Sequence, residues 1–263
     1  MAQFLNKVAI VTGASSGIGK GVAMHLASLG CCLSLSGRNR DNLNETRLKC
    51  LESSNGLVKE NQIIVVEGDL VDEINRVNLI NKTIDHFGRL DVLVNSAGII
   101  AKGTVEVTPP DVWDKVMDVN VKTVFHLTQL AIPHLKKTKG NIVNVSSVNG
   151  LRAFAGVAAY CVSKAALDQL TRNTALELAA DGVRVNSVNP GVIITEIHKR
   201  GGMSDEEYAA FLEKSKTTHP LGRPGNVDEV ARAVRFLADN QDSSFITGVT
   251  LSVDGGRNLV CPR

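Results

Sequence analysis

The sequence predicts an α/β fold in which one parallel sheet is wound with helices on both faces. Short apolar runs rich in β-branched residues recur without polar alternation, as at Val8–Val11 and Val92–Val94. Such runs are typical of strands that are buried on both faces. Longer amphipathic segments separate these runs from start to finish. Strands that alternate with helices indicate a parallel, doubly wound sheet with right-handed crossovers.

The pattern predicts seven strands and six helical segments. The strands are expected near residues 7–12, 31–36, 62–67, 90–95, 140–146, 183–189 and 249–253. The helices are expected near 17–29, 40–53, 71–87, 110–136, 157–180 and 226–239. No repeat or linker divides the chain, so residues 1–263 are expected to form a single domain. In such folds ligands bind beyond the carboxyl ends of the strands, so the residues just after each strand indicate function.

Composition excludes several functional classes. With 29 basic and 27 acidic residues, the net charge of +2 is too balanced to favour nucleic acid or an anionic membrane as partner. No apolar run approaches the ~20 residues of a membrane span, and no signal-peptide pattern is evident. The five cysteines form no CxxC pair, which favours reduced thiols and a cytoplasmic location. The histidines show no metal-ligand spacing, so we expect no metal.

A glycine-rich turn, Thr12-Gly-Ala-Ser-Ser-Gly-Ile-Gly19, lies between the first strand and the first helix. Glycines let a phosphate approach the backbone, and the start of a helix offers it unpaired N–H groups and a positive dipole end. The turn lies in the context that dinucleotide binding requires. We therefore predict that it binds the cofactor phosphates through Gly13, Ser15, Ser16, Gly17, Ile18 and Gly19.

The end of the second strand indicates which cofactor is used. NAD enzymes usually place a carboxylate there, but this chain has Ser36, Gly37, Arg38 and Asn39. Asp41 comes later and is interpreted as a helix cap. Arg38 can pair with a 2′-phosphate through its planar fork, with Ser36 and Asn39 beside it. We expect NADP rather than NAD, although a solvated Arg38 in a polar loop is the alternative.

The strongest catalytic signal is Ser147, followed by Tyr160 and Lys164. Tyr160 and Lys164 are four residues apart in a helix-forming stretch, so they share one helix face. A nearby ammonium favours the phenolate and would lower the pKa of Tyr160 from about 10. A tyrosine tuned in this way can donate a proton to a carbonyl or accept one from an alcohol. Ser146 and Ser147 both follow the fifth strand, from where a hydroxyl can bind the substrate oxygen.

These motifs together resemble the short-chain dehydrogenase/reductase family over essentially the whole chain. The family's features include the Thr-Gly-x-x-x-Gly-x-Gly turn, the Ser147/Tyr160/Lys164 spacing, and an Asn-Asn-Ala-Gly turn that reads Asn-Ser-Ala-Gly at residues 95–98 here. The family spacing selects Ser147 rather than Ser146 as the catalytic serine. The resemblance implies a Rossmann-like, three-layer fold with sheet order 3-2-1-4-5-6-7. It also implies a homotetramer, or less often a homodimer.

The resemblance assigns further site residues. It makes Asn120 the fourth catalytic residue, which holds a water in a proton relay through Lys164. Asp69 and Leu70 would contact the adenine, and Lys164 would also hold the nicotinamide ribose. The other implied cofactor-binding residues are Asn95, Ala97, Gly98, Tyr160, Pro190, Gly191, Val192, Ile193 and Thr195.

We therefore expect an NADP(H)-dependent oxidoreductase that interconverts a carbonyl and a secondary alcohol. It looks most like a 3-oxoacyl reductase or a broad carbonyl reductase. An NAD-linked alcohol dehydrogenase for steroids, retinoids or sugars stays open, as does a non-catalytic NADP-binding scaffold. Residues 196–222, with a short amphipathic helix around 204–216, are predicted to form a substrate lid. Cys161 is interpreted either as a redox-sensitive thiol or as a small buried residue.

Overall fold

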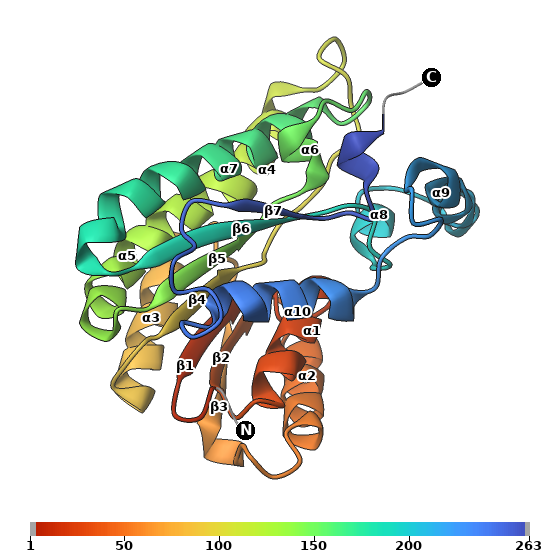
Figure 1. The fold of residues 1–263 in the computed structure, drawn as a ribbon. Coiled ribbons are helices and arrows are strands. Elements are labelled where there is room, and N and C mark those ends of the chain that lie inside the picture. Colours follow the sequence, from red (N-terminus) through yellow and green to blue (C-terminus); the bar gives the residue numbers. More distant parts are fainter. Residues whose placement is uncertain (1–3, 261–263) are drawn as a thin grey trace.

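The computed structural model describes residues 4–260 and contains one seven-stranded parallel sheet between two layers of helices (Figure 1). The sheet order is β3-β2-β1-β4-β5-β6-β7, which confirms the order that the family resemblance implied. The strands are β1 (Val8–Thr12), β2 (Cys32–Gly37), β3 (Ile63–Glu67), β4 (Val92–Asn95), β5 (Asn141–Val145), β6 (Arg184–Pro190) and β7 (Thr250–Val253). The predicted strand positions hold to within one or two residues at each end.

Helices cover both faces of the sheet. One face carries α1 (Gly17–Ala27), α2 (Arg40–Ser53) and α10 (Val227–Ala238). The other carries α3 (Glu73–Phe87), α4 (Pro110–Met117), α5 (Thr123–Thr138) and α7 (Ala158–Leu178). Shorter helices lie beyond the strand ends, namely α6 (Val148–Leu151), α8 (Ile197–Arg200) and α9 (Asp205–Thr218). There are also three short 3₁₀-helical turns, η1 (Glu60–Gln62), η3 (Ala179–Asp181) and η4 (Arg257–Leu259).

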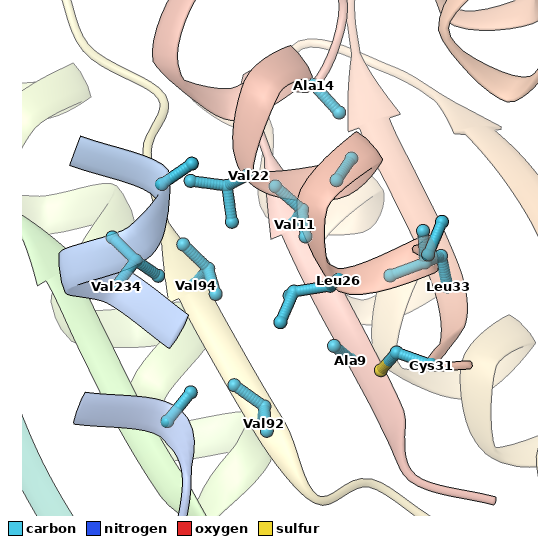
Figure 2. Packing of buried hydrophobic residues seen from close by; sticks show 14 of the residues in the cluster. Ala9, Val11, Ala14, Val22, Leu26, Cys31, Leu33, Val92, Val94 and Val234 are labelled. Carbon is cyan, nitrogen blue, oxygen red and sulfur yellow. The ribbon is translucent and has the colours of Figure 1, made fainter. Parts of the chain in front are cut away.

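The core is split by the sheet, because neighbouring side chains of a strand point to opposite faces. Val11 and Val94 pack with Val22 and Leu26 of α1 and Val234 of α10, as Figure 2 shows. The alternate strand residues join α3, α5 and α7 in the second cluster, which includes Ile10, Leu79, Leu93, Leu127 and Ile142. Burial on both faces explains why the strand runs lack polar alternation.

The predicted helix over 110–136 is two helices joined by a π-helical turn, η2 (Asp118–Lys122). The prediction of one continuous α-helix was wrong here. A π-helical turn contains one residue more than an α-helical turn, and hydrophobic periodicity does not reveal that extra residue. π-turns of this kind occur often at functional sites. This one contains Asn120, whose side chain is completely buried.

Helix hydrophobicity and the state of the cysteines complete the description of the structure. Within residues 4–260, no helix is long and apolar enough to cross a membrane. Cys31, Cys32, Cys50 and Cys161 are free thiols, as the cysteine pattern predicted. Cys261 lies outside the described residues.

Candidate active site

A cavity of about 530 Å³ opens where the strands end, as expected for a doubly wound sheet. One part is walled by the glycine-rich turn and by the ends of β2 and β3. The other is walled by the segments after β5 and β6 and by the lid region. The predicted site residues on its wall are Gly13, Ser15, Ser16, Gly17, Ile18, Gly19, Arg38, Asp69, Leu70, Ala97, Gly98, Ser147, Tyr160, Lys164, Pro190, Gly191, Val192, Ile193 and Thr195.

The glycine-rich turn has the geometry of an anion site. Gly13 has φ +64°, a backbone conformation that residues with a side chain rarely adopt. At Gly19, a Cβ would collide with the Gly13 carbonyl. The N-cap of α1, Ser16, makes no side-chain capping hydrogen bond. The first turn of α1, with its positive dipole end, lines the cavity without a side-chain cap.

The end of β2 joins this turn. A Cβ on Gly37 would lie 3.2 Å from Ser15 Oγ, so the absence of a side chain keeps Ser15 and the β2 end close together. Arg38 Nη1 lies 3.7 Å from Asp69 Oδ2, and both side chains are half exposed. Such a pair is weak. The Arg38 guanidinium is thus held only weakly at the cavity wall.

Three predicted cofactor residues do not line the cavity. The Asn39 side chain caps α2 by accepting from Asn42 N at 2.8 Å, so the cap is Asn39 and not Asp41 as expected. Asn95 is buried and donates to Asn144 Oδ1 at 2.9 Å, and Ser36 is also buried. The turn after β4 is held instead by Thr12, whose Oγ1 accepts from Ser96 N and Ala97 N. Sequence reasoning had not assigned that role.

Tyr160 and Lys164 lie on one face of α7, and the Lys164 Nζ is 5.6 Å from the centre of the Tyr160 ring. Lys164 Nζ donates to the Val145 carbonyl at 2.8 Å, at the end of β5. Both side chains are buried. The helix therefore aims the pair at the strand ends, where the cavity lies.

Burial dominates the titration of this pair. It raises the pKa of Tyr160 to about 12, although hydrogen bonding with Ser147 acts in the opposite direction. It lowers the pKa of Lys164 to about 8, while the nearby Asp168 carboxylate acts to raise it. The expectation of a lowered Tyr160 pKa was wrong for this structure, because i,i+4 spacing carries no information about desolvation.

Ser147 lies directly after β5, as predicted. It caps the start of α6, where its Oγ accepts from Asn149 N at 3.1 Å and donates to Asn149 Oδ1 at 3.2 Å. The Ser147 carbonyl accepts from Asn189 Nδ2 at 2.9 Å. The hydroxyl is thus fixed on the cavity wall near the Tyr160 phenol.

Asn120 lies behind the wall rather than on it. From the π-turn, its Oδ1 accepts from Ile99 N and its Nδ2 donates to Ile99 O, both at 2.9 Å, and to Ser163 Oγ at 3.0 Å. Gly98 lies between Asn120 and Lys164, because a Cβ there would be 3.3 Å from Asn120 Oδ1 and 3.6 Å from Lys164 Nζ. The glycine therefore leaves space where the two side chains approach each other.

The turn after β6 is bound to the lid region. Tyr208 of α9 donates to the Thr195 carbonyl at 2.9 Å and accepts from Thr195 N at 3.2 Å. The imidazole of His219, just after α9, accepts from Val192 N at 3.1 Å. Burial lowers the pKa of His219, which favours the neutral ring that this bond requires. The predicted helix at 204–216 is α9, and α8 was not predicted.

Sequence reasoning missed part of the far wall of the cavity, namely Ile100, Phe154 and Arg257; His198, Met203 and Phe211 on the same wall belong to the segment 196–222 that was predicted to cover the substrate. The guanidinium carbon of Arg257 lies 4.9 Å from the centre of the Phe154 ring. His198 packs against Phe211 with ring centres 4.6 Å apart. Arg257 comes shortly after β7, so the strand-end rule was a signal for it. The other residues come from segments that only the fold brings together.

Comparison with known proteins shows which family this chain belongs to. Residues 13–258 match the family described as enoyl-(acyl carrier protein) reductase. A 3-oxoacyl-[acyl-carrier-protein] reductase of Thermotoga maritima is 36% identical, over 95% of this chain and 97% of that one. The chain belongs to the short-chain dehydrogenase/reductase family. This confirms the resemblance seen in the sequence motifs.

Other members of the short-chain dehydrogenase/reductase family also match this chain over nearly its whole length. The meso-2,3-butanediol dehydrogenase of Serratia marcescens is 35% identical, over 97% of this chain and 95% of that one. A Caenorhabditis elegans short-chain dehydrogenase/reductase of unknown function, solved with cofactor, has a TM-score of 0.93. It is 38% identical and covers 98% of this chain and 97% of its own. The protein is thus an oxidoreductase that acts on CH–OH or carbonyl groups.

Proposed function

We propose that the protein is an NADP(H)-dependent carbonyl reductase in which Tyr160 is the acid/base. One observation carries this proposal. Tyr160, Lys164 and Ser147 lie on the wall of the cavity whose other end is formed by the glycine-rich turn and Arg38. A dinucleotide with its phosphates at the turn can extend along this cavity toward the three catalytic side chains.

Each catalytic side chain has a role that its position supports. When bound, the nicotinamide supplies the hydride in reduction and accepts it in oxidation. Ser147 binds the substrate oxygen, and the Tyr160 phenol donates a proton to that oxygen or takes one from it. The Lys164 ammonium stabilises the tyrosinate that donation leaves behind. Asn120 positions the Ile99 backbone and, across the space at Gly98, holds a water that returns a proton to Lys164.

NADP is proposed over NAD because of the residues around the β2 end. Arg38 is at the cavity, its one ion pair within residues 4–260 is the weak one with Asp69, and Ser15 lies against Gly37 beside it. A guanidinium fork with a neighbouring hydroxyl suits a 2′-phosphate. Asp69 and Leu70 border the place where the adenine would lie.

For the substrate, we propose a 3-oxoacyl compound or a broader set of ketones. Named relatives include both a 3-oxoacyl reductase and a butanediol dehydrogenase, so the family alone supports more than one branch. The apolar lining from Ile100, Phe154, Met203 and Phe211 supports a substrate with a carbon chain or ring next to the carbonyl.

The remaining proposals concern organisation. Residues 4–260 share one sheet, which supports a single domain, and the polar contacts of Tyr208 and His219 support a hinged lid over residues 196–222. Exposed Trp113 on α4 and Phe125 on α5 support a homo-oligomer, with a tetramer preferred to a dimer. The free thiols support a cytoplasmic location of the protein.

The test is the oxidation of NADPH and of NADH by purified protein with a panel of 3-oxoacyl thioesters, diketones, steroids, retinal and sugars. The proposal predicts NADPH-dependent reduction of 3-oxoacyl compounds or simple ketones. A strict preference for NADH with alcohol oxidation would favour the alcohol dehydrogenase alternative. Tight NADPH binding without any turnover would favour the non-catalytic scaffold.

A further inference from the structure

Within residues 4–260, the guanidinium of Arg257 lies in the cavity wall without a carboxylate in direct contact. Arg257 begins η4, shortly after β7, and lines the cavity that Ser147 and Tyr160 also line. Among residues 4–260, its side chain forms no hydrogen bond or ion pair; it packs on the Phe154 ring, and the Asp254 carboxylate acts on its charge without direct contact. Burial disfavours its charged form and lowers its pKa. Burying a cation without an anion in contact costs folding free energy, which indicates that an anionic ligand pairs with Arg257.

The position of Arg257 is fixed by its neighbours. Arg152 Nη1 donates to the carbonyls of Arg257 and Asn258, at 3.2 and 3.0 Å. The Asp254 carboxylate accepts from Gly256 N at 3.0 Å and from Asn258 N at 2.7 Å. Figure 1 shows η4, the short blue helix near the C-terminus, close to α6. The guanidinium is therefore held over Phe154, in the segment between Ser147 and Tyr160.

The charges around Arg257 leave it positive toward the cavity. The Asp254 carboxylate is engaged by backbone amides, and Glu196 lies 3.9 Å from Lys199. Lys102, also on the cavity wall, pairs with Glu207 at 3.1 Å. Arg200 lines the cavity too, but it is exposed, so water screens its charge.

We propose that the substrate is a carbonyl compound carrying a carboxylate, and that Arg257 binds this carboxylate while Ser147 and Tyr160 bind the carbonyl oxygen. The planar guanidinium fork matches a carboxylate with two parallel hydrogen bonds. Phe154 and Phe211 contact the chain or ring that joins the two groups. The proposal rests on the proposed carbonyl reductase function and makes Arg257 a specificity-determining residue.

The first test compares an acid with its neutral ester. With NADPH, wild type reduces benzoylpropionate with a higher kcat/KM than its methyl ester. Arg257→Gln lowers kcat/KM for the acid about 10- to 100-fold, because it removes a hydrogen-bonded charge pair, and changes that for the ester less than about 3-fold. Arg257→Lys keeps part of the preference. Arg172→Gln, an exposed change on α7, leaves both rates unchanged.

The second test does not need turnover. Calorimetry measures the binding of phenylbutyrate and of phenylbutyramide to the protein saturated with NADP⁺. Wild type binds the acid more tightly, and Arg257→Gln removes the difference. Arg257-dependent binding without reduction of any ketone would refute the reductase function while the anion site stands. Equal treatment of acid and neutral ligand by wild type, in rate and in binding, overturns the proposal.

Discussion

The Nε2 atom of His219 accepts a hydrogen bond from the backbone N–H of Val192 at 3.1 Å. Because Nε2 is the acceptor, the proton is on Nδ1, which donates to the Ser215 carbonyl at 2.8 Å. One neutral ring thus joins the end of α9 to the turn after β6, which lines the cavity. We therefore expect the position of α9 and the placement of the turn to be coupled through His219.

Replacing His219 tests this coupling. His219→Leu leaves the buried Val192 N–H without an acceptor, so we expect the free energy of unfolding to fall by about 1–3 kcal/mol. We also expect KM for NADPH to rise several-fold, since the turn is no longer fixed. Urea denaturation and steady-state kinetics measure the two effects. His134→Leu, on α5, is the matched control, and equal behaviour of the two variants would refute the coupling.

His198 predicts how stability depends on pH. Burial, assisted by the Arg257 charge, lowers its pKa in the folded protein to about 4, against about 6.5 in an unfolded chain. Between these values the unfolded chain binds more protons. The free energy of unfolding therefore falls as pH falls from about 6.5 to 4, and this contribution is constant below that range.

The measurement is the free energy of unfolding of wild type and of His198→Phe at pH 7 and at pH 5. Phenylalanine keeps the packing against Phe211 but does not titrate. We expect the loss on acidification to be smaller in the variant by about 1–2 kcal/mol, less than the full pKa shift implies because the ring keeps some solvent contact. An identical loss in both proteins would contradict the assignment.

Arg38 is predicted to set cofactor preference. Arg38→Asp replaces the guanidinium with a carboxylate that repels a 2′-phosphate and accepts from a ribose hydroxyl. The ratio of kcat/KM for NADPH to that for NADH should fall about 100-fold or more, the scale of one lost charged hydrogen bond plus a repulsion.

Arg40→Asp is the control for Arg38. Arg40 is equally exposed and lies 3.7 Å from Glu67, but it is not on the cavity wall. Its replacement should leave the cofactor ratio unchanged. If both variants keep the wild-type ratio, then Arg38 does not select the cofactor.

Sequence reasoning succeeded where the signal is local. The strands were found because burial on both faces leaves unalternating apolar runs. The placement of Ser147, Tyr160 and Lys164 at one cavity was predicted because strand ends meet at one edge of a parallel sheet and because i,i+4 residues share a helix face. Neither rule needs knowledge of distant contacts.

Where several segments combine, the sequence was insufficient. The π-turn that places Asn120 is one extra residue in an otherwise helical pattern. The pKa of Tyr160 depends on burial by surrounding elements, and spacing does not report that burial. Phe154 and Arg257 are about a hundred residues apart in the sequence, and only the closure of the sheet by β7 brings them to one wall.

The central claim is that the Tyr160 phenol moves the proton in this cavity. Its most direct measurement is NADPH-dependent ketone reduction by Tyr160→Phe, together with the affinity of the variant for NADPH. We predict that kcat falls by about 10²–10⁴-fold, the usual contribution of a positioned acid/base, while the NADPH affinity stays within about 3-fold of wild type. Turnover close to the wild-type rate would contradict the account, because another group would then supply the proton.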